Sequence, residues 1–284
     1  MTIGGILSGL SPNYESLVVF RGMVGFGVGG CSVPFDLLAE FLPAKERGNF
    51  LMFIEYFWTV GSMFIIFMAW WLLIVFDWRA LCVITSIPVG VACLYGIKHL
   101  PESPRWLLIK ERPREAEVIV KEAARINGVD LGNFSLTISP MEIADAKRES
   151  ETPFYLAYLP LFEGTMIYNT LPMLTVWLCF SFMYYGLILF ITRVYSTSND
   201  DGPTCSFDYP PILENSTVEF LGTTVVLLCV NKLGRVRSQV YSYSVCGMAM
   251  LLMGLLNRTP AAFILFAMVG RASAMGGACA TWVS

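Results

Sequence analysis

The sequence predicts an all-α membrane protein, a polytopic bundle of transmembrane helices. Hydrophobic residues make up 55% of the 284-residue chain and charged residues 14%, whereas soluble domains carry about 25% charged residues. The apolar residues fall in runs of about 18 to 25, the length that crosses a hydrocarbon core of about 30 Å. Polar segments separate these runs, as expected for the loops between spans.

Seven complete spans and one partial span are expected. The complete spans are predicted at 17–39, 50–76, 78–100, 170–192, 214–231, 239–257 and 260–283. Residues 1–10 are apolar but too short to cross a membrane, and they lack the charged first region and the cleavage site of a signal peptide. We therefore interpret them as part of another helix and the bundle as incomplete.

A long polar segment, 101–153, separates the third and fourth spans. Within it, apolar residues recur at helical spacing over Arg114–Asn127, which predicts an amphipathic helix ended by Gly128. The next segment, 154–169, is apolar but interrupted by proline and glutamate, so we expect it to approach the membrane without crossing it.

The basic residues predict the orientation of the bundle. Most of the 19 lysines and arginines lie in three alternate loops, 40–49, 98–153 and 232–238. Loops rich in lysine and arginine remain in the cytosol during insertion. These loops are therefore predicted to be cytosolic, and the polar loop 193–213 is predicted to face the opposite side.

Composition argues against several functional classes. The net charge is -3, and no basic run suggests a nucleic-acid partner. The single histidine, His99, cannot supply a metal cluster, and the eight cysteines show no zinc spacing and no disulfide framework. We therefore expect no catalytic residue, no metal, no cofactor and no enzyme activity.

Charged residues inside the predicted spans are candidates for function, because each is costly in lipid. Arg21 and Glu219 lie near the outer ends of their predicted spans, Asp36 near an inner end, and Glu55 one to two turns inside. Arg271 lies near the middle of the membrane. It either lines a pathway or pairs with an acid, and both alternatives stay open.

An aromatic stripe runs along the fourth span, formed by Trp177, Phe180, Tyr184 and Tyr185. Stripes of this kind usually pack against other helices. The alternative is a pathway lining that offers aromatic faces and hydroxyl groups to an organic ion.

The first predicted span is rich in glycine. Gly22, Gly25 and Gly29 share one helical face, and small residues at this spacing let a neighbouring helix come close. A dinucleotide-binding fingerprint is rejected, because that motif requires a strand and a soluble βαβ unit around it.

Three predicted cytosolic helix ends carry compact charged motifs, at 39–48, 100–108 and 231–237. Ion pairs among them could lock the cytosolic face and break when it opens. The alternative is a set of solvated anchoring charges, each of which contributes little. The candidate gate residues are Glu40, Arg47, Glu102, Arg105 and Arg235.

Together these motifs resemble the major facilitator superfamily. The sequence reads E-x-x-P-x-x-x-R-G at 40–48, P-E-S-P-R-W-L-L at 101–108 and L-G-R at 233–235. The resemblance covers nearly all 284 residues. Segments 55–61 and 182–187 are most similar to the synaptic-vesicle-two-related proteins, which are relatives of the organic cation and anion transporters.

The resemblance implies two six-helix halves around a central pathway. On this mapping the chain begins inside helix three and ends at the cytosolic side of helix ten. Residues 1–100 then belong to the N-terminal half, 101–169 form a cytosolic loop with amphipathic helices, and 170–284 belong to the C-terminal half. Asn231 departs from the acidic residue usual before L-G-R.

The implied function is transport of a small organic solute by alternating access, in a multi-pass protein of the plasma membrane or an intracellular vesicle. The partners would be the lipid bilayer, the solute and, if transport is coupled, a proton or cation. The pathway candidates are Arg271, Glu55, Trp177, Phe180, Tyr184 and Tyr185. The alternative is a non-transporting vesicle-membrane or regulatory protein of the same fold.

The orientation can be tested by cysteine labelling from outside the cell. A membrane-impermeant maleimide should modify Cys205, in the predicted outer loop, but not a cysteine introduced at Lys121 in the predicted cytosolic loop. The reverse labelling pattern would overturn the orientation.

Overall fold

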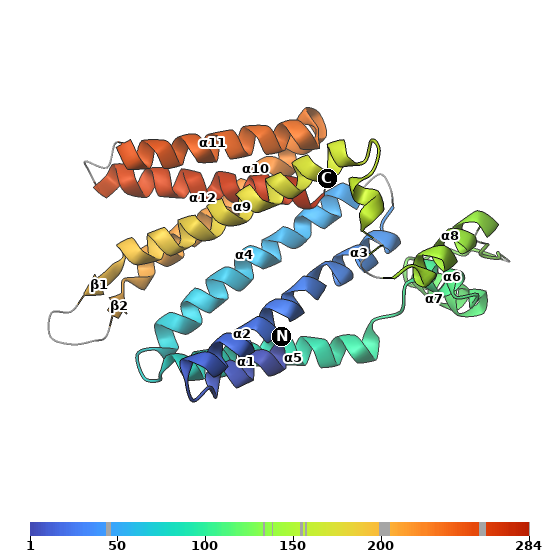
Figure 1. Ribbon diagram of the computed structural model, residues 1–284, viewed down its shortest axis with the longest axis horizontal. Coiled ribbons are helices and arrows are strands. Elements are labelled where there is room, and N and C mark those ends of the chain that lie inside the picture. Colours follow the sequence, from blue (N-terminus) through green and yellow to red (C-terminus); the bar gives the residue numbers. More distant parts are fainter. Residues whose placement is uncertain are drawn as a thin grey trace. The chain divides into compact units, whose positions relative to one another are not determined.

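The structure is a computed structural model that describes residues 1–43, 47–132, 134–137, 139–153, 156, 158–198, 205–255 and 260–283. These residues are mainly α-helical (Figure 1) and fall into two compact units, each described by itself. The long apolar helices agree with the prediction of an all-α membrane bundle.

The first unit comprises Met1–Gly29, Leu42–Pro88 and Val176–Ser284. Its elements are α1 (Thr2–Gly9), α2 (Tyr14–Val28), α4 (Arg47–Leu72), the start of α5 (Trp78–His99), most of α9 (Ile167–Val194), β1 (Ser196–Ser198), β2 (Cys205–Phe207), α10 (Tyr209–Leu233), α11 (Arg235–Leu255) and α12 (Pro260–Trp282). Helix α12 packs along both α10 and α11, and α4 packs against α10. Figure 1 shows α11 and α12 side by side.

The second unit comprises Gly30–Phe41 and Val89–Thr175. Its elements are α3 (Ser32–Phe41), the end of α5, α6 (Pro104–Ile109), α7 (Pro113–Ile126), α8 (Pro140–Glu151), the short 3-10 helix η2 (Leu159–Phe162) and the start of α9; a 3-10 turn, η1 (Gly29–Cys31), joins α2 to α3.

Six helices of the described chain are long and apolar enough to cross a membrane. They are the continuous stretch Tyr14–Phe41, then Arg47–Leu72, Trp78–His99, Ile167–Val194, Tyr209–Leu233 and Ala261–Trp282. The seventh predicted span, 239–257, is helical as α11 up to Leu255, the last residue of this described range, but it does not reach the same apolarity. Besides the arginines of its first turn, α11 carries Gln239 and then alternating serine and tyrosine residues over 241–244, which explains the difference.

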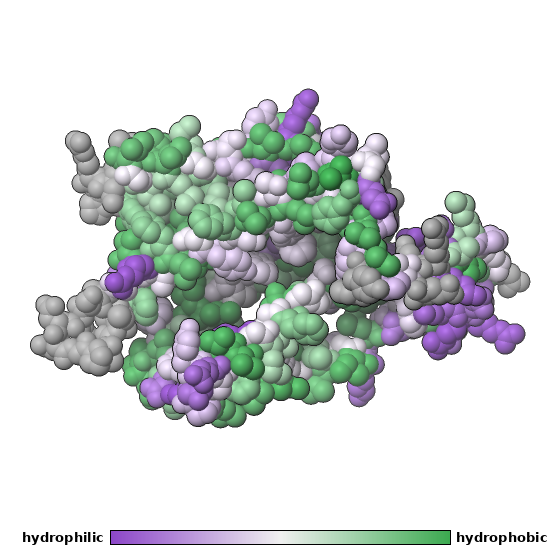
Figure 2. Space-filling view, in the orientation of Figure 1, coloured by the Kyte–Doolittle hydropathy of each residue, from purple (hydrophilic) through white to green (hydrophobic). Residues whose placement is uncertain are grey.

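Many large apolar side chains on these helices are exposed, which is expected where lipid is the surrounding solvent. Phe26 is 90% exposed and Phe182 is 82% exposed. Figure 2 shows hydrophobic residues spread over the long helices, whereas hydrophilic residues gather around α6 and α7. In water such a surface would favour aggregation, so the pattern fits a bilayer.

The predicted amphipathic helix is confirmed as α7. Ala116 on its apolar face is fully buried, and Gly128 after its end adopts a φ of +70°, the left-handed conformation that favours glycine. On its polar face the Arg125 guanidinium donates two hydrogen bonds to Glu122, at 2.8 and 2.6 Å, and holds the pKa of that carboxyl below its usual value.

The loop 193–213 contains a feature that sequence reasoning missed. Strands β1 and β2 pair antiparallel, with Ser196 opposite Phe207 and Ser198 opposite Cys205. Each strand has three residues, too few for an alternating pattern to show. Residues 199–204 and the side chain of Cys205, the expected labelling target, lie outside the described residues.

Close packing through glycine occurs elsewhere than expected. No described atom lies within 4 Å of the position that a Cβ would take at Gly22, Gly25 or Gly29. At Gly222 of α10, by contrast, a Cβ would collide with the backbone carbonyl of Ala272 in α12. At Gly276 it would lie 2.8 Å from Val226. Small residues therefore bring α10 and α12 together.

A methyl group at Gly222 should push α10 away from α12. We expect Gly222→Ala to lower the apparent melting temperature of the detergent-solubilised protein by about 5 °C, since overpacking costs about 1–3 kcal/mol. The matched control is Gly247→Ala in α11, where a Cβ meets open space. The control should keep or raise stability because alanine favours helix. Equal melting temperatures for the two variants would contradict the close contact.

Candidate functional site

The first unit contains a buried ion pair. The Nε of Arg271, in α12, is 2.8 Å from Oε1 of Glu219, in α10. Arg271 is 3% exposed and Glu219 is 0% exposed. Of the two alternatives for Arg271, pairing with an acid is what the structure shows; whether the residue also lines a pathway stays a prediction.

The position of Glu219 corrects an expectation. Its span was predicted to begin at 214, which placed the residue near an outer end. Helix α10 begins at Tyr209 instead, with prolines in its first turn. Glu219 therefore lies ten residues into the helix, roughly 15 Å along its axis at 1.5 Å per residue. Arg271 lies about as far from the start of α12, so both charges reach the same depth.

Two aromatic residues extend the ion pair into a polar network. The Tyr184 hydroxyl, from α9, donates a hydrogen bond of 3.0 Å to Glu219 Oε1. The Trp58 indole, from α4, donates a hydrogen bond of 3.0 Å to the Tyr184 hydroxyl. The buried polar network, by which we mean Tyr184, Glu219, Arg271 and the indole N–H of Trp58, whose ring is itself 47% exposed, thus joins four helices. Trp58 and Glu219 were not among the predicted pathway residues.

Some buried polar atoms near this network have no hydrogen-bond partner within the described chain. They include Glu219 Oε2 and Thr59 Oγ1. Glu55 lies one turn before Thr59 on α4, and both residues are buried. Buried polar atoms are nearly always paired, so each of these atoms has the capacity to accept a further hydrogen bond.

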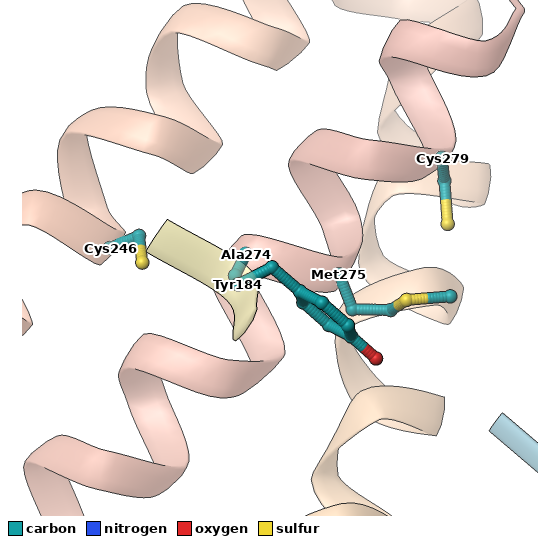
Figure 3. Close-up of a cluster of buried hydrophobic side chains, with 5 residues drawn as sticks. All are labelled: Tyr184, Cys246, Ala274, Met275 and Cys279. Carbon is teal, nitrogen blue, oxygen red and sulfur yellow. The ribbon is translucent and has the colours of Figure 1, made fainter. Parts of the chain in front are cut away.

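The aromatic stripe of α9 divides into a buried part and an exposed part. Tyr184 is buried with Cys246 of α11 and Met275 of α12 (Figure 3). Trp177 packs edge-on against Trp282, with 4.8 Å between the ring centroids. The ring of Phe180 packs against that of Tyr184, with 5.5 Å between the centroids. Tyr185 is 53% exposed. Helix packing therefore accounts for much of the stripe, while Tyr184 also belongs to the buried polar network.

Helices α4 and α10 also contact each other directly. The hydroxyls of Tyr56 and Thr224 are 2.7 Å apart, and the Tyr56 ring stacks on Phe220 at 5.9 Å. Both helices thus present hydroxyl and aromatic groups along one shared interface.

Two of the charged motifs meet where α4 begins and α10 ends. Asn231 Nδ2 donates a hydrogen bond of 3.2 Å to Asn49 Oδ1. A Cβ at Gly48 would lie 3.6 Å from Nη2 of Arg235. Arg235 also donates a hydrogen bond of 2.5 Å to the carbonyl of Val283, just after α12, where a cation complements the helix dipole.

The other gate candidates have separate contacts. Arg47 donates to the carbonyl of Leu42 at 3.4 Å, Glu40 accepts a hydrogen bond from Ser103, and Arg105 lies 3.7 Å from Glu142. Glu102 is exposed. No ion pair found among the described residues joins two of the five candidates. The cytosolic gate therefore stays a prediction.

The other charges predicted inside spans are less enclosed. Arg21 donates a hydrogen bond of 3.2 Å to the Cys82 sulfur, and Asp36 is exposed. Within the described residues no group of three or more His, Cys, Asp or Glu side chains could hold a metal ion. The site can pair charges and accept hydrogen bonds.

Comparison with known proteins supplies the identity. The family described as sugar (and other) transporter matches residues 1–283. The synaptic vesicle 2-related protein of Pongo abelii shares 29% sequence identity with this chain. The aligned region covers 98% of this chain and 52% of that protein. The organic cation/carnitine transporter 7 of Arabidopsis thaliana also shares 29% sequence identity, and the aligned region covers 86% of this chain and 55% of that protein. The chain thus spans about half the length of these relatives.

Solved structures show the same fold. The xylose transporter XylE of E. coli, in a partially occluded inward-open conformation, superposes with a TM-score of 0.70 at 18% identity. This match covers 99% of the present chain and 67% of XylE. The resemblance inferred from the charged motifs is thereby confirmed, as is the assignment to a multi-pass membrane protein. The chain belongs to the sugar (and other) transporter family of the major facilitator superfamily.

Proposed function

We propose that this chain forms part of a transporter that moves a small organic solute across the membrane by alternating access. The observation that carries the proposal is the buried polar network. On the proposed mapping, α4 belongs to the N-terminal half, whereas α9, α10 and α12 belong to the C-terminal half. The hydrogen bond from Trp58 to Tyr184 then links the two halves in the middle of the membrane.

Such a link is suited to opening and closing. A neutral hydrogen bond contributes only about 1 kcal/mol net, so a solute or water that replaces the partner can compensate for its loss. The ion pair of Glu219 and Arg271 lies within the proposed C-terminal half. It would stay intact and hold the Tyr184 hydroxyl in place while the halves move.

The site favours a solute that carries a hydrogen-bond donor or a positive charge. Glu219 Oε2 has no partner in the described chain and can accept from a hydroxyl or ammonium group. The ring of Trp58, which is 47% exposed, offers a face to a cation. The names of relatives refer to organic cations, carnitine and xylose, and all three classes satisfy this requirement.

The contacts at the cytosolic end support the same mechanism. The amide pair of Asn49 and Asn231 joins α4 to α10, as the network does deeper in the membrane. Asn231 replaces the acidic residue usual at this position. An uncharged hydrogen bond therefore takes part in the proposed cytosolic gate, and it can break without leaving a charge unpaired.

Uptake into proteoliposomes tests the proposal. A transport-competent protein containing this sequence should take up at least one of carnitine, tetraethylammonium or xylose with saturable kinetics. Folded protein that takes up none of these solutes would contradict the proposal and support the alternative of a non-transporting vesicle-membrane or regulatory protein.

The Tyr184 hydroxyl should control transport more than folding. We expect Tyr184→Phe to reduce the initial uptake rate about tenfold, because both the bond from Trp58 and the bond to Glu219 are lost. The matched control is Tyr168→Phe, an exposed position on the same helix, which should leave uptake unchanged. If both variants transport normally, the network has no role in the transport cycle.

The two charges should differ in their effect on stability. Glu219→Gln leaves the Arg271 guanidinium buried without a counterion. Because this group cannot become neutral by losing a proton, we expect the variant to lose about 3–5 kcal/mol of folding stability. Arg271→Leu should cost less, since a lone carboxyl can become neutral by binding a proton. The double variant should be nearly as stable as the parent. Thermal unfolding in detergent measures the order of stability of the three variants. An Arg271→Leu variant that is less stable than Glu219→Gln would contradict the expected order.

A further inference from the structure

A largely apolar groove of about 500 Å³ lies across α10, α11 and α12. Its walls come from Leu221 and Val225 of α10, Val245 of α11, and Leu265 and Val269 of α12, among others. The side chains of Leu221, Val225 and Val245 are each about half exposed. The groove therefore opens to the surroundings and is separate from the buried polar network, none of whose residues line it.

The floor of the groove is formed by residues with little or no side chain. Gly222 of α10 and Gly276 and Ala272 of α12 line it where the two helices are closest. The hydroxyl of Ser273, one of the few polar groups present, donates to the carbonyl of Val269 at 2.6 Å. The residues Leu265 to Gly276 extend roughly 16 Å along α12, a length that suits a long alkyl chain.

Two basic residues stand at one end of this groove. Lys232 follows Val225 by seven residues and so lies two turns further along the same face of α10. Arg237 precedes Tyr241, which lines the groove, by one turn of α11. Both basic residues are exposed, and no ion pair found in the described chain includes either of them.

We propose that the groove binds one acyl chain of an anionic phospholipid, with the lipid phosphate held by Lys232 and Arg237. The apolar lining matches a hydrocarbon chain, and the membrane supplies lipid at high concentration. The basic end matches the headgroup charge. On the predicted orientation this end faces the cytosolic leaflet, where anionic lipids are enriched, and basic pockets between helices bind such headgroups.

A protein occupant fits the groove less well. A second copy of this chain or another helix would have to bring an acidic group to the level of Lys232 and Arg237 as well as an apolar surface. A phospholipid carries both features in one molecule, and its phosphate lies at the membrane surface, where the two basic side chains end.

Native mass spectrometry of the purified chain in detergent micelles tests this assignment. The probes are phosphatidylserine and phosphatidylcholine with identical acyl chains. The parent protein should retain phosphatidylserine about tenfold more than phosphatidylcholine, since each basic residue near the surface strengthens binding of an anionic lipid severalfold. Lys232→Gln combined with Arg237→Gln should reduce this preference at least fivefold.

Matched controls separate headgroup from chain recognition. Lys98→Gln with Arg114→Gln removes the same charge from exposed positions elsewhere and should leave the preference intact. Val269→Trp fills the groove and should abolish retention of both lipids, whereas Leu251→Trp, at an exposed position of α11 that does not line the groove, should not.

Three results would overturn the proposal. One is equal retention of both lipids by the parent protein. Another is the same loss of preference in the control pair of charge variants, which would indicate a general effect of net charge. The third is a lipid-free dimer whose formation is blocked by Val269→Trp, which would assign the groove to a second copy of the chain.

Discussion

The charge of Arg271 constrains much of the first unit. A guanidinium cannot become neutral by losing its proton, so at this depth it requires a counterion or a polar cavity. Glu219 meets that requirement only if α10 and α12 keep their relative positions along the membrane normal. The close contact at Gly222 serves the same end, because helices whose backbones nearly touch leave short distances for their side chains to bridge.

The ion pair in turn organises the neighbouring helices. Its acceptor, Glu219 Oε1, also accepts a hydrogen bond from the Tyr184 hydroxyl, and that hydroxyl accepts one from the Trp58 indole. Burial of the charges and of the Tyr184 hydroxyl is favourable only when each has a partner, so the position of one charge constrains the position of an aromatic residue on α9, to which the partly exposed Trp58 of α4 then bonds. Three buried atoms, Glu219 Oε2, Thr59 Oγ1 and Asn215 Oδ1, stay outside this pairing within the described chain, and each leaves room for a polar partner.

The long helices and the amphipathic helix α7 could be predicted because hydrophobicity and helical spacing are local properties of the chain. The depth of Glu219 could not, because Pro210 and Pro211 look like a loop although prolines are tolerated in the first turn of a helix. Its pairing with Arg271 depends on contacts between residues 52 positions apart, which no spacing rule reveals. The relation of the gate candidates to one another depends likewise on tertiary contacts.

Helix α12 shows how one span can serve two environments. Its Arg271 side faces the ion pair, whereas Leu265, Val269 and Gly276 face the groove. A helix rich in glycine and alanine is thin, so neighbours can approach it closely on more than one side. On the proposed reading, the same small residues that allow α10 to pack tightly also form the floor of the lipid site. A change of lipid at the groove would then act directly on the contact that positions Glu219, which would give the bilayer a physical route to the proposed transport site.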